Sequence, residues 1–123
     1  MHMTHPHGIG PDCLRINSVV STIGDKWSVM IVMVLIVRSH RFNEMKRAIG
    51  GISQQMLART LRALERDGLI ARTVHATVPP QVEYALTDLG RSLAEPILEL
   101  GNWAQMHIDE IEKNRASFDG RPL

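Results

Sequence analysis

The chain lacks several features that would place it in common classes of protein. A single cysteine among 123 residues excludes an internal disulfide framework and is typical of a reducing compartment. No stretch near the start has the charged-then-apolar pattern of a signal peptide. The longest apolar run, Val29–Val37, is shorter than the roughly 18 residues that a transmembrane helix needs. We therefore expect a cytoplasmic protein with no membrane partner.

Signatures of catalysis and of cofactor binding are also missing. The sequence has no Ser/His/Asp set, no glycine-rich phosphate loop and no paired carboxylates in a plausible cleft. His2, His5 and His7 lie close together, but a flexible leader cannot maintain the tetrahedral geometry that selects a metal. We predict that the protein is not an enzyme and binds no metal or cofactor.

The length and composition indicate one globular domain. Hydrophobic residues make up 44% of the chain and charged residues 22%, which is the balance of a folded domain. We expect a flexible leader over residues 1–12, one domain over 13–113 and a frayed polar tail over 114–123.

Charge is distributed unevenly along the chain, although the net charge is only +1. From Arg38 to Arg72 there are eight Arg or Lys residues against three acidic ones, a net charge of +5. From Glu83 to Asp119 there are eight acidic residues against three basic ones, a net charge of −5. This asymmetry predicts one surface for an anionic partner and another that faces away from it.

An amphipathic helix is expected between Ser53 and Gly68. Ser53 can cap its start with the hydroxyl, and Gly68 can end it with a positive φ. The apolar positions fall on one side at helical spacing: Met56, Leu57, Thr60, Leu61 and Leu64. The opposite side carries Gln55, Ala58, Arg59, Arg62 and Arg66.

That polar side has the side chains that read DNA, because Arg binds guanine edges, Gln binds adenine edges and both hold phosphates. An ordinary solvated helix face is the alternative. Two β-forming segments follow, over 69–74 and 82–86, joined by a turn that contains Pro79 and Pro80. A recognition helix followed by such a ribbon is the winged form of helix-turn-helix. The predicted fold class is therefore mainly α with a small β-hairpin, with an added long C-terminal helix.

Three helices are expected before the recognition helix. The first covers Cys13–Ile23, with Ile16, Val19, Val20 and Ile23 facing inward. The second runs from Lys26, capped by Asp25, to about Arg38 and should be buried on nearly all sides, with Trp27, Met30 and Met33 in the core. After an extended connector at residues 40–42, Asn43 should cap a short helix through Ile49.

A long final helix should begin after Thr87 and reach about Lys113. One apolar stripe follows its length: Leu89, Leu93, Ile97, Leu100, Ala104, Ile108 and Ile111. A helix of roughly 40 Å is too long for a small core to cover, so a second copy is expected to cover the rest. Pro96 and Gly101 should weaken or bend it. The predicted dimer interface comprises Ile16, Val20, Leu93, Ile97, Leu100, Trp103, Ala104 and Ile108.

Two groups of DNA contacts are predicted. On the recognition helix, Gln55, Arg59 and Arg62 are expected at base edges, with Ser53 and Gln54 near the backbone. Phosphate or sugar contacts are expected from residues outside that helix: Lys26, Arg41, Lys46, Arg47, Arg72, His75, Pro79 and Gln81. The predicted partner is double-stranded DNA with an inverted-repeat operator.

Several segments together resemble the HxlR-type winged-helix transcriptional regulators, which are related to the MarR group. They are Cys13, Gly24–Trp27, Arg41–Met45, Gly51–Leu57, Leu61–Ile70 and Val78–Thr87. The resemblance implies a homodimer through the first and last helices, with the Ser53 helix in the major groove and the wing along the backbone. It also implies that some members sense oxidants or electrophiles through a cysteine near the first helix.

Three alternatives remain open at this stage. Cys13, at the start of a helix, is either a sensor thiol or a small packed hydrophobe. An apolar effector in the dimer interface could replace the thiol as the signal. A winged helix that binds a protein and never touches DNA is the third alternative, although it would be expected to show a neutral or apolar face on the Ser53 helix.

Overall fold

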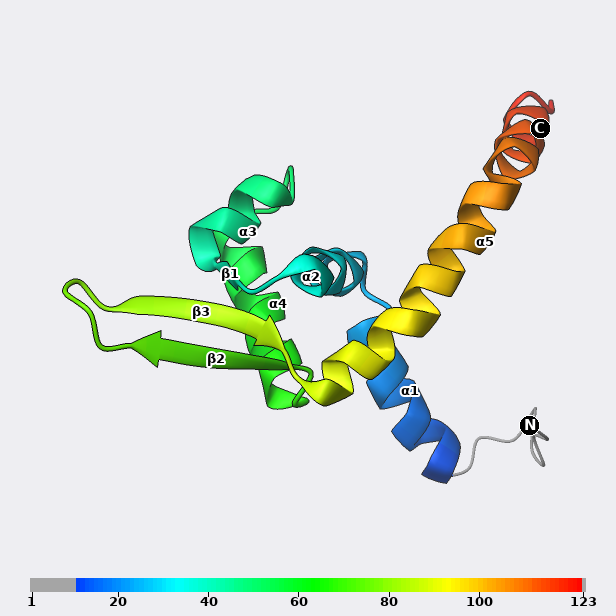
Figure 1. Cartoon of the computed structure of the whole chain (residues 1–123). Helices are drawn as coiled ribbons and strands as arrows, with labels where there is room; N and C mark the ends of the chain where they lie inside the picture. The colour runs from blue at the N-terminus through cyan, green and yellow to red at the C-terminus, as the bar shows by residue number, and fades with distance from the viewer. Residues whose placement is uncertain (1–10, 123) are drawn as a thin grey trace.

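The computed structural model describes residues 11–122 and shows a helical protein with one small antiparallel sheet (Figure 1). The predicted fold class is confirmed. The elements in chain order are α1 (Pro11–Ile23), α2 (Lys26–Val37), β1 (His40–Arg41), α3 (Phe42–Ala48), α4 (Gln54–Arg66), β2 (Ile70–His75), β3 (Gln81–Leu86) and α5 (Asp88–Asp119). The predicted leader, with its three histidines, lies outside the described residues up to residue 10.

Local hydrogen bonds set the start of α2 and both ends of α4 where the sequence predicted them. The carboxylate of Asp25 accepts from the backbone N–H of Trp27 at 3.1 Å, and Ser53 Oγ accepts from that of Met56 at 3.0 Å. Gly68 has a φ of +77°, and the next N–H, of Leu69, donates to the carbonyl of Leu64 at 2.9 Å. This is the Schellman arrangement, which pairs the free carbonyls at the end of α4.

The sheet has the strand order β1-β3-β2, with all pairs antiparallel. In the hairpin Ile70 lies opposite Leu86, and His75 lies opposite Gln81. The connector predicted at residues 40–42 is extended only at His40–Arg41, where it also forms a strand, because His40 pairs with Tyr84; Phe42 already belongs to α3. The predicted cap of α3 is also wrong: the helix begins after Arg41, whose N–H donates to Glu44 Oε1 at 2.8 Å.

The core lies between α2, α3, α4 and the inner end of the sheet. Its fully buried side chains include Ile31, Met45, Ile49, Leu57, Leu61 and Leu64. Trp27 is half-buried against this core, as predicted. Met30 and Met33 are not core residues, since they remain 37% and 47% exposed. The prediction that α2 is buried on nearly all sides is therefore wrong, and part of its apolar surface faces outward.

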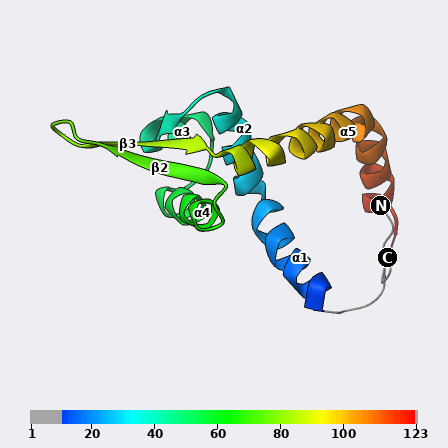
Figure 2. The ribbon, with the colours of Figure 1, turned by 60° about the horizontal axis from the view of Figure 1, so that its bottom comes forward.

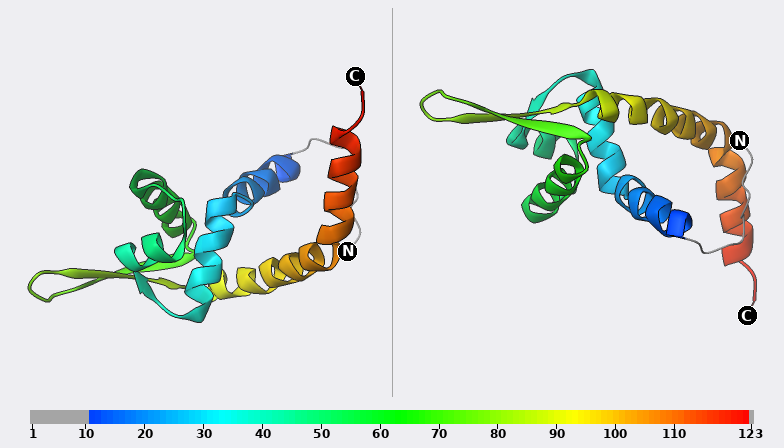
Figure 3. Two further views of the ribbon diagram at one scale, coloured as in Figure 1. Left: turned by 90° about the horizontal axis from the view of Figure 1, so that it is seen from above. Right: turned by 90° about the horizontal axis from the view of Figure 1, so that it is seen from below.

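The first and last helices also differ from expectation. Helix α1 begins two residues early, and Ile16, Val19 and Val20 are exposed instead of facing inward. Helix α5 continues through residues 114–119, which were expected to be a frayed tail. Its ribbon changes direction in its second half (Figure 3).

The elements separate into two halves on either side of α2. The α4 helix and the β2–β3 hairpin lie on one side, and α1 and most of α5 extend from the other (Figures 1 and 2). In the views from above and from below, α1 and α5 leave the two ends of α2 in different directions (Figure 3). Within residues 11–122 no single helix is long and apolar enough to cross a membrane, and α1 and α2, which reach that composition only as a pair, meet at 65°.

Candidate nucleic-acid interface

The outer face of α4 is polar and carries no acidic residue in its first two turns. Leu57, Leu61 and Leu64 bury the inner face, which leaves Gln55, Arg59 and Arg62 exposed on the other. Ser53 and Gln54, at the exposed start of the helix, lie beside backbone N–H groups that attract anions. This face has the chemistry and the exposure of a recognition helix.

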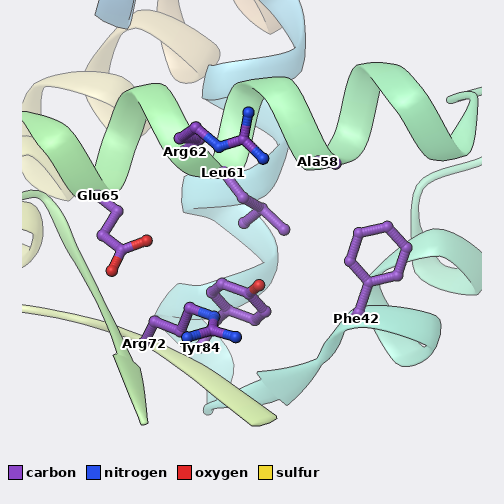
Figure 4. A pocket seen from close by; sticks show the side chains of 7 residues that line it. All are labelled: Phe42, Ala58, Leu61, Arg62, Glu65, Arg72 and Tyr84. Carbon is purple, nitrogen blue, oxygen red and sulfur yellow. The ribbon is translucent and has the colours of Figure 1, made fainter. Parts of the chain in front are cut away.

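A hollow of about 370 Å³ lies between α4 and the sheet (Figure 4), and we call it the wing hollow. Its walls come from α3, α4, β2 and β3: Phe42, Ala58, Leu61, Arg62, Glu65, Arg72 and Tyr84. Arg62 reaches it from the helix, and Arg72 reaches it from the strand beneath. Two guanidinium groups separated by ten positions in the sequence therefore line one hollow.

A second hollow, of about 450 Å³, lies between α3 and the tip of the hairpin. It is lined in part by Arg41, Arg47, Pro80 and Gln81. Arg41 donates to Gln81 Oε1 at 2.7 Å, which ties the start of α3 to the wing. Arg41 and Arg47, both predicted to contact the DNA backbone, therefore lie beside Gln81, the wing residue with the same predicted role.

The hairpin presents different side chains on its two faces. Arg72 and Tyr84 are a cross-strand pair, and both line the wing hollow on the side of α4. His75 belongs to the other face with Glu83, whose Oε1 lies 2.6 Å from His75 Nε2. Ser39 donates to the second oxygen of Glu83 at 3.1 Å. These two hydrogen bonds lower the pKa of the Glu83 carboxyl below its ordinary value, and the bond with His75 has the larger effect.

Some predicted contact residues are not gathered at these hollows. Lys26 places Nζ 4.5 Å from the centroid of the Trp27 ring at the start of α2. Lys46 and Pro79 are exposed, and neither lines the hollows beside α3 and α4. His75 is exposed but is held by Glu83, so its ring is already paired within the chain.

Sequence reasoning missed three residues of this region: Glu65, Glu83 and Tyr84. The alternation along residues 81–84 was visible in the sequence, and it places Glu83 and Tyr84 on opposite faces. Which face meets α4 depends on the packing of the hairpin, which the sequence pattern did not show. Glu65 follows Arg62 by three positions and so lies beside it on α4.

The residues predicted for sensing and for the dimer lie in the other half of the molecule. Cys13 is half-buried in the first turn of α1, next to an exposed pair in which Arg15 and Asp12 are 3.2 Å apart. Leu100, Trp103, Ala104 and Ile108 are exposed on α5. Ile97 is only 8% exposed and Leu93 packs against the core, so these two belong mainly to the chain's own interior.

Residues 22–112 match the HxlR-like helix-turn-helix family. YtfH of Escherichia coli strain K12, an uncharacterized HTH-type transcriptional regulator, is 40% identical over 93 residues, which are 76% of this chain and 74% of YtfH. The structure of a putative transcriptional regulator, ytfH from Salmonella typhimurium, is 35% identical and has a TM-score of 0.76, covering 82% of this chain and 90% of that one. The redox regulator HypR in its reduced form is 37% identical with a TM-score of 0.75, covering 80% and 98%. The chain therefore belongs to the HxlR-like helix-turn-helix family of transcriptional regulators, and it is not an enzyme.

Proposed function

We propose that this regulator binds an inverted-repeat DNA operator as a homodimer, with α4 in the major groove and the β2–β3 wing along the backbone. The observation that carries the proposal is the exposed polar face of α4 flanked by two arginine-lined hollows. The arginines of both hollows, Arg41, Arg47, Arg62 and Arg72, belong to the segment whose net charge is +5. A cationic surface of this shape is suited to a duplex.

Gln55 and Arg59 are the proposed base readers. Both lie in the first two turns of α4, and the first turns of a recognition helix are the part that meets base edges. Ser53 and Gln54 would contact the backbone at the helix start. Arg41, Arg47 and Gln81 would contact phosphate or sugar from the second hollow. Further backbone contacts are proposed for the exposed Lys46 and Pro79, and minor ones for His75 and Lys26.

The dimer is proposed from the apolar surface that α1, α2 and α5 leave exposed. Ile16 and Val20 on α1, Met33 on α2 and Leu100 and Trp103 on α5 are all between 47% and 63% exposed. Large apolar side chains left exposed in such number are typical of an interaction site. In a two-fold dimer the two α4 helices would lie about 34 Å apart, one turn of DNA.

Selection of bound fragments from a random duplex pool tests this proposal. We expect one inverted repeat to be enriched and its affinity to fall steeply as salt rises, since several phosphates are neutralised. Arg59→Ala should cost about 1–3 kcal/mol of binding free energy and relax the preference at one base pair. Arg115→Ala, an exposed arginine of α5, is the matched control and should leave binding unchanged.

Failure to enrich any sequence, together with salt-independent affinity, would refute DNA recognition. The winged-helix fold would then be a protein-binding module. The arginines on α4 speak against that alternative, because such a module would be expected to present a neutral or apolar recognition helix.

Cys13 is the proposed sensor of oxidants or electrophiles. Two observations support it: the thiol is only half-buried, and the structurally similar HypR is named a redox regulator. Because the chain has one cysteine, oxidation by a thiol oxidant such as diamide would join Cys13 to the partner's Cys13 or to an external thiol, with loss of two protons and two electrons to diamide. Such a link, or alkylation, would shift the two reading helices out of register.

Titration of wild type and Cys13→Ser with diamide, or with a quinone, tests the sensor. We expect operator binding to fall in the wild type and to persist in the variant. An equal response in both proteins would leave Cys13 as packing, with an apolar effector at the dimer interface as the remaining candidate signal.

A further inference from the structure

The wing hollow brings together charged groups that the chain itself does not pair. In the described part of the chain, Arg62, Arg72 and Glu65 form no salt bridge or side-chain hydrogen bond with one another or with any other residue. Two guanidinium groups and one carboxylate leave the hollow with a net charge of +1. The arrangement therefore lacks one negative charge.

We propose that the wing hollow is the seat of one DNA backbone phosphodiester, held between Arg62 and Arg72, with the hydroxyl of Tyr84 as a further donor. The inference rests on the proposed DNA binding and specifies how one part of that site works. A phosphodiester carries one negative charge and so neutralises the hollow. Its two free oxygens suit donors that approach from two sides, here from α4 above and from the sheet below (Figure 4).

The position of Arg62 on α4 favours the backbone over the bases. At 100° per residue, Arg62 lies about 60° closer than Arg59 to the side of the helix that faces the sheet. It also lies roughly 12 Å along the axis from Gln54, beyond the first turns that enter the groove most deeply. We therefore assign Arg62 to the backbone contacts, together with Arg72, although the sequence predicted that it would read a base.

Glu65 has a definite role in this arrangement. Its carboxylate shares the hollow with the two arginines and faces the same space (Figure 4). It limits the positive charge of the hollow, and it repels a phosphate that enters. Removing its charge should therefore tighten binding to any duplex, an effect that damage to the fold would not produce.

Anisotropy titrations with the selected operator and with an unrelated duplex test the proposal. We expect Arg62→Gln and Arg72→Gln each to weaken binding tenfold or more to both duplexes alike and to reduce the salt slope by about 0.9. Glu65→Gln should tighten both by a few fold. Arg66→Gln, on the same helix but outside the wing hollow, is the matched control and should have a much smaller effect. A loss confined to the operator in Arg62→Gln would show that Arg62 reads a base and would overturn the proposal.

A scan with single methylphosphonate linkages identifies the phosphate. In the wild type one uncharged linkage per half-site should lower affinity about as much as Arg62→Gln does, and the two changes should not add. If the loss of affinity from Arg62→Gln adds to the loss from a methylphosphonate at every position of the operator, the proposed phosphate site is wrong, even when the wild type binds the operator. Inorganic phosphate should displace the operator no better than chloride does at equal ionic strength. If phosphate displaces it better, and no single methylphosphonate linkage lowers affinity, the hollow binds a free anion and the proposal is overturned. If wild type binds neither duplex, the proposed function itself fails.

Discussion

At the scale of single residues, the junction between α4 and α5 is held by a few backbone and hydroxyl groups. Thr87 Oγ1 donates to the carbonyl of Gly68 at 2.6 Å and accepts from the N–H of Gly90 at 3.1 Å. A Cβ on Gly90 would lie 2.0 Å from the carbonyl oxygen of Leu69. The absence of a side chain at this position therefore allows the start of α5 to pack directly on the end of the recognition-helix segment.

Gly90→Ala should destabilise the protein by about 1–3 kcal/mol, because backbone atoms must move to admit the methyl group. Gly101→Ala is the matched control within α5, since nothing lies within 4 Å of a Cβ there. It should stabilise the helix by up to about 1 kcal/mol. Urea denaturation of the two variants measures both changes. Equal free energies of unfolding for the two variants would contradict a steric constraint at Gly90.

At the scale of elements, the wing is a two-stranded ribbon whose outer part is exposed on both faces. Residues 71–80 are all exposed, so the hairpin tip has little apolar packing to hold its shape. The bonds of Glu83 to His75 and Ser39 tie β3 to β2 and to the residue before β1. Polar pairing, more than a core, orders this end of the sheet.

The order of the wing should depend on acid through Glu83. Its folded-state pKa lies below the ordinary value of 4.5, with the hydrogen bond to His75 as the main cause. The stabilisation is therefore complete above about pH 4.5 and is lost as the pH falls through the lower folded-state value. In the wild type, the protection of amides in residues 72–83, measured as the observed hydrogen-exchange rate relative to the intrinsic rate at the same pH, should therefore fall across that interval.

Glu83→Gln is the control, because its hairpin should show no such acid transition. Glu44 has a pKa that is also lowered, by the N–H of Arg41 and then by Arg38, but it belongs to α3. Amides of α3 therefore report Glu44, and amides of the hairpin report Glu83. An unchanged transition in the Glu83→Gln hairpin would assign the effect to another group.

At the scale of the whole molecule, cationic and apolar surfaces lie on opposite sides of α2. The arginine-lined hollows belong to the half with α3, α4 and the wing. The exposed apolar residues belong mainly to α1 and α5. A second copy that covers the apolar half would leave both DNA-facing halves free, as a symmetric regulator requires.

Leu100→Glu should convert the proposed dimer to a monomer and, with it, abolish tight operator binding. Leu100 is 63% exposed in the single chain, so the substitution should affect association more than folding. Asn102→Glu introduces the same residue on the opposite side of α5 and should leave the dimer intact. Sedimentation at micromolar concentration separates the two results, and dimers of Leu100→Glu would exclude this part of α5 from the interface.

Ile97→Glu should behave differently, because Ile97 is buried in the chain's own core. We expect it to lower the free energy of unfolding by several kcal/mol, as an unpaired charge does in an apolar interior. Circular dichroism during urea denaturation would show this loss. A stable but monomeric Ile97→Glu protein would instead return this residue to the dimer interface.

The sequence alone determined the helices, most of their ends and the winged architecture. Asp25, Ser53, Gly68 and Thr87 act through hydrogen bonds or backbone angles within a few residues, and the apolar spacing of α4 repeats within one helix. Such signals are local, so they can be read from neighbouring residues. The same local reading failed at Arg41, where a glutamate three positions later caps α3 through the backbone.

Only the tertiary structure decided the features that join distant segments. Pairing of His40 with Tyr84 made a third strand, and the packing of the hairpin brought Arg72 to the same hollow as Arg62 and Glu65. Packing also buried Ile97 while it left Met33 exposed. Residues with the same local pattern meet different neighbours, because strand register and helix packing depend on contacts between segments far apart in the chain.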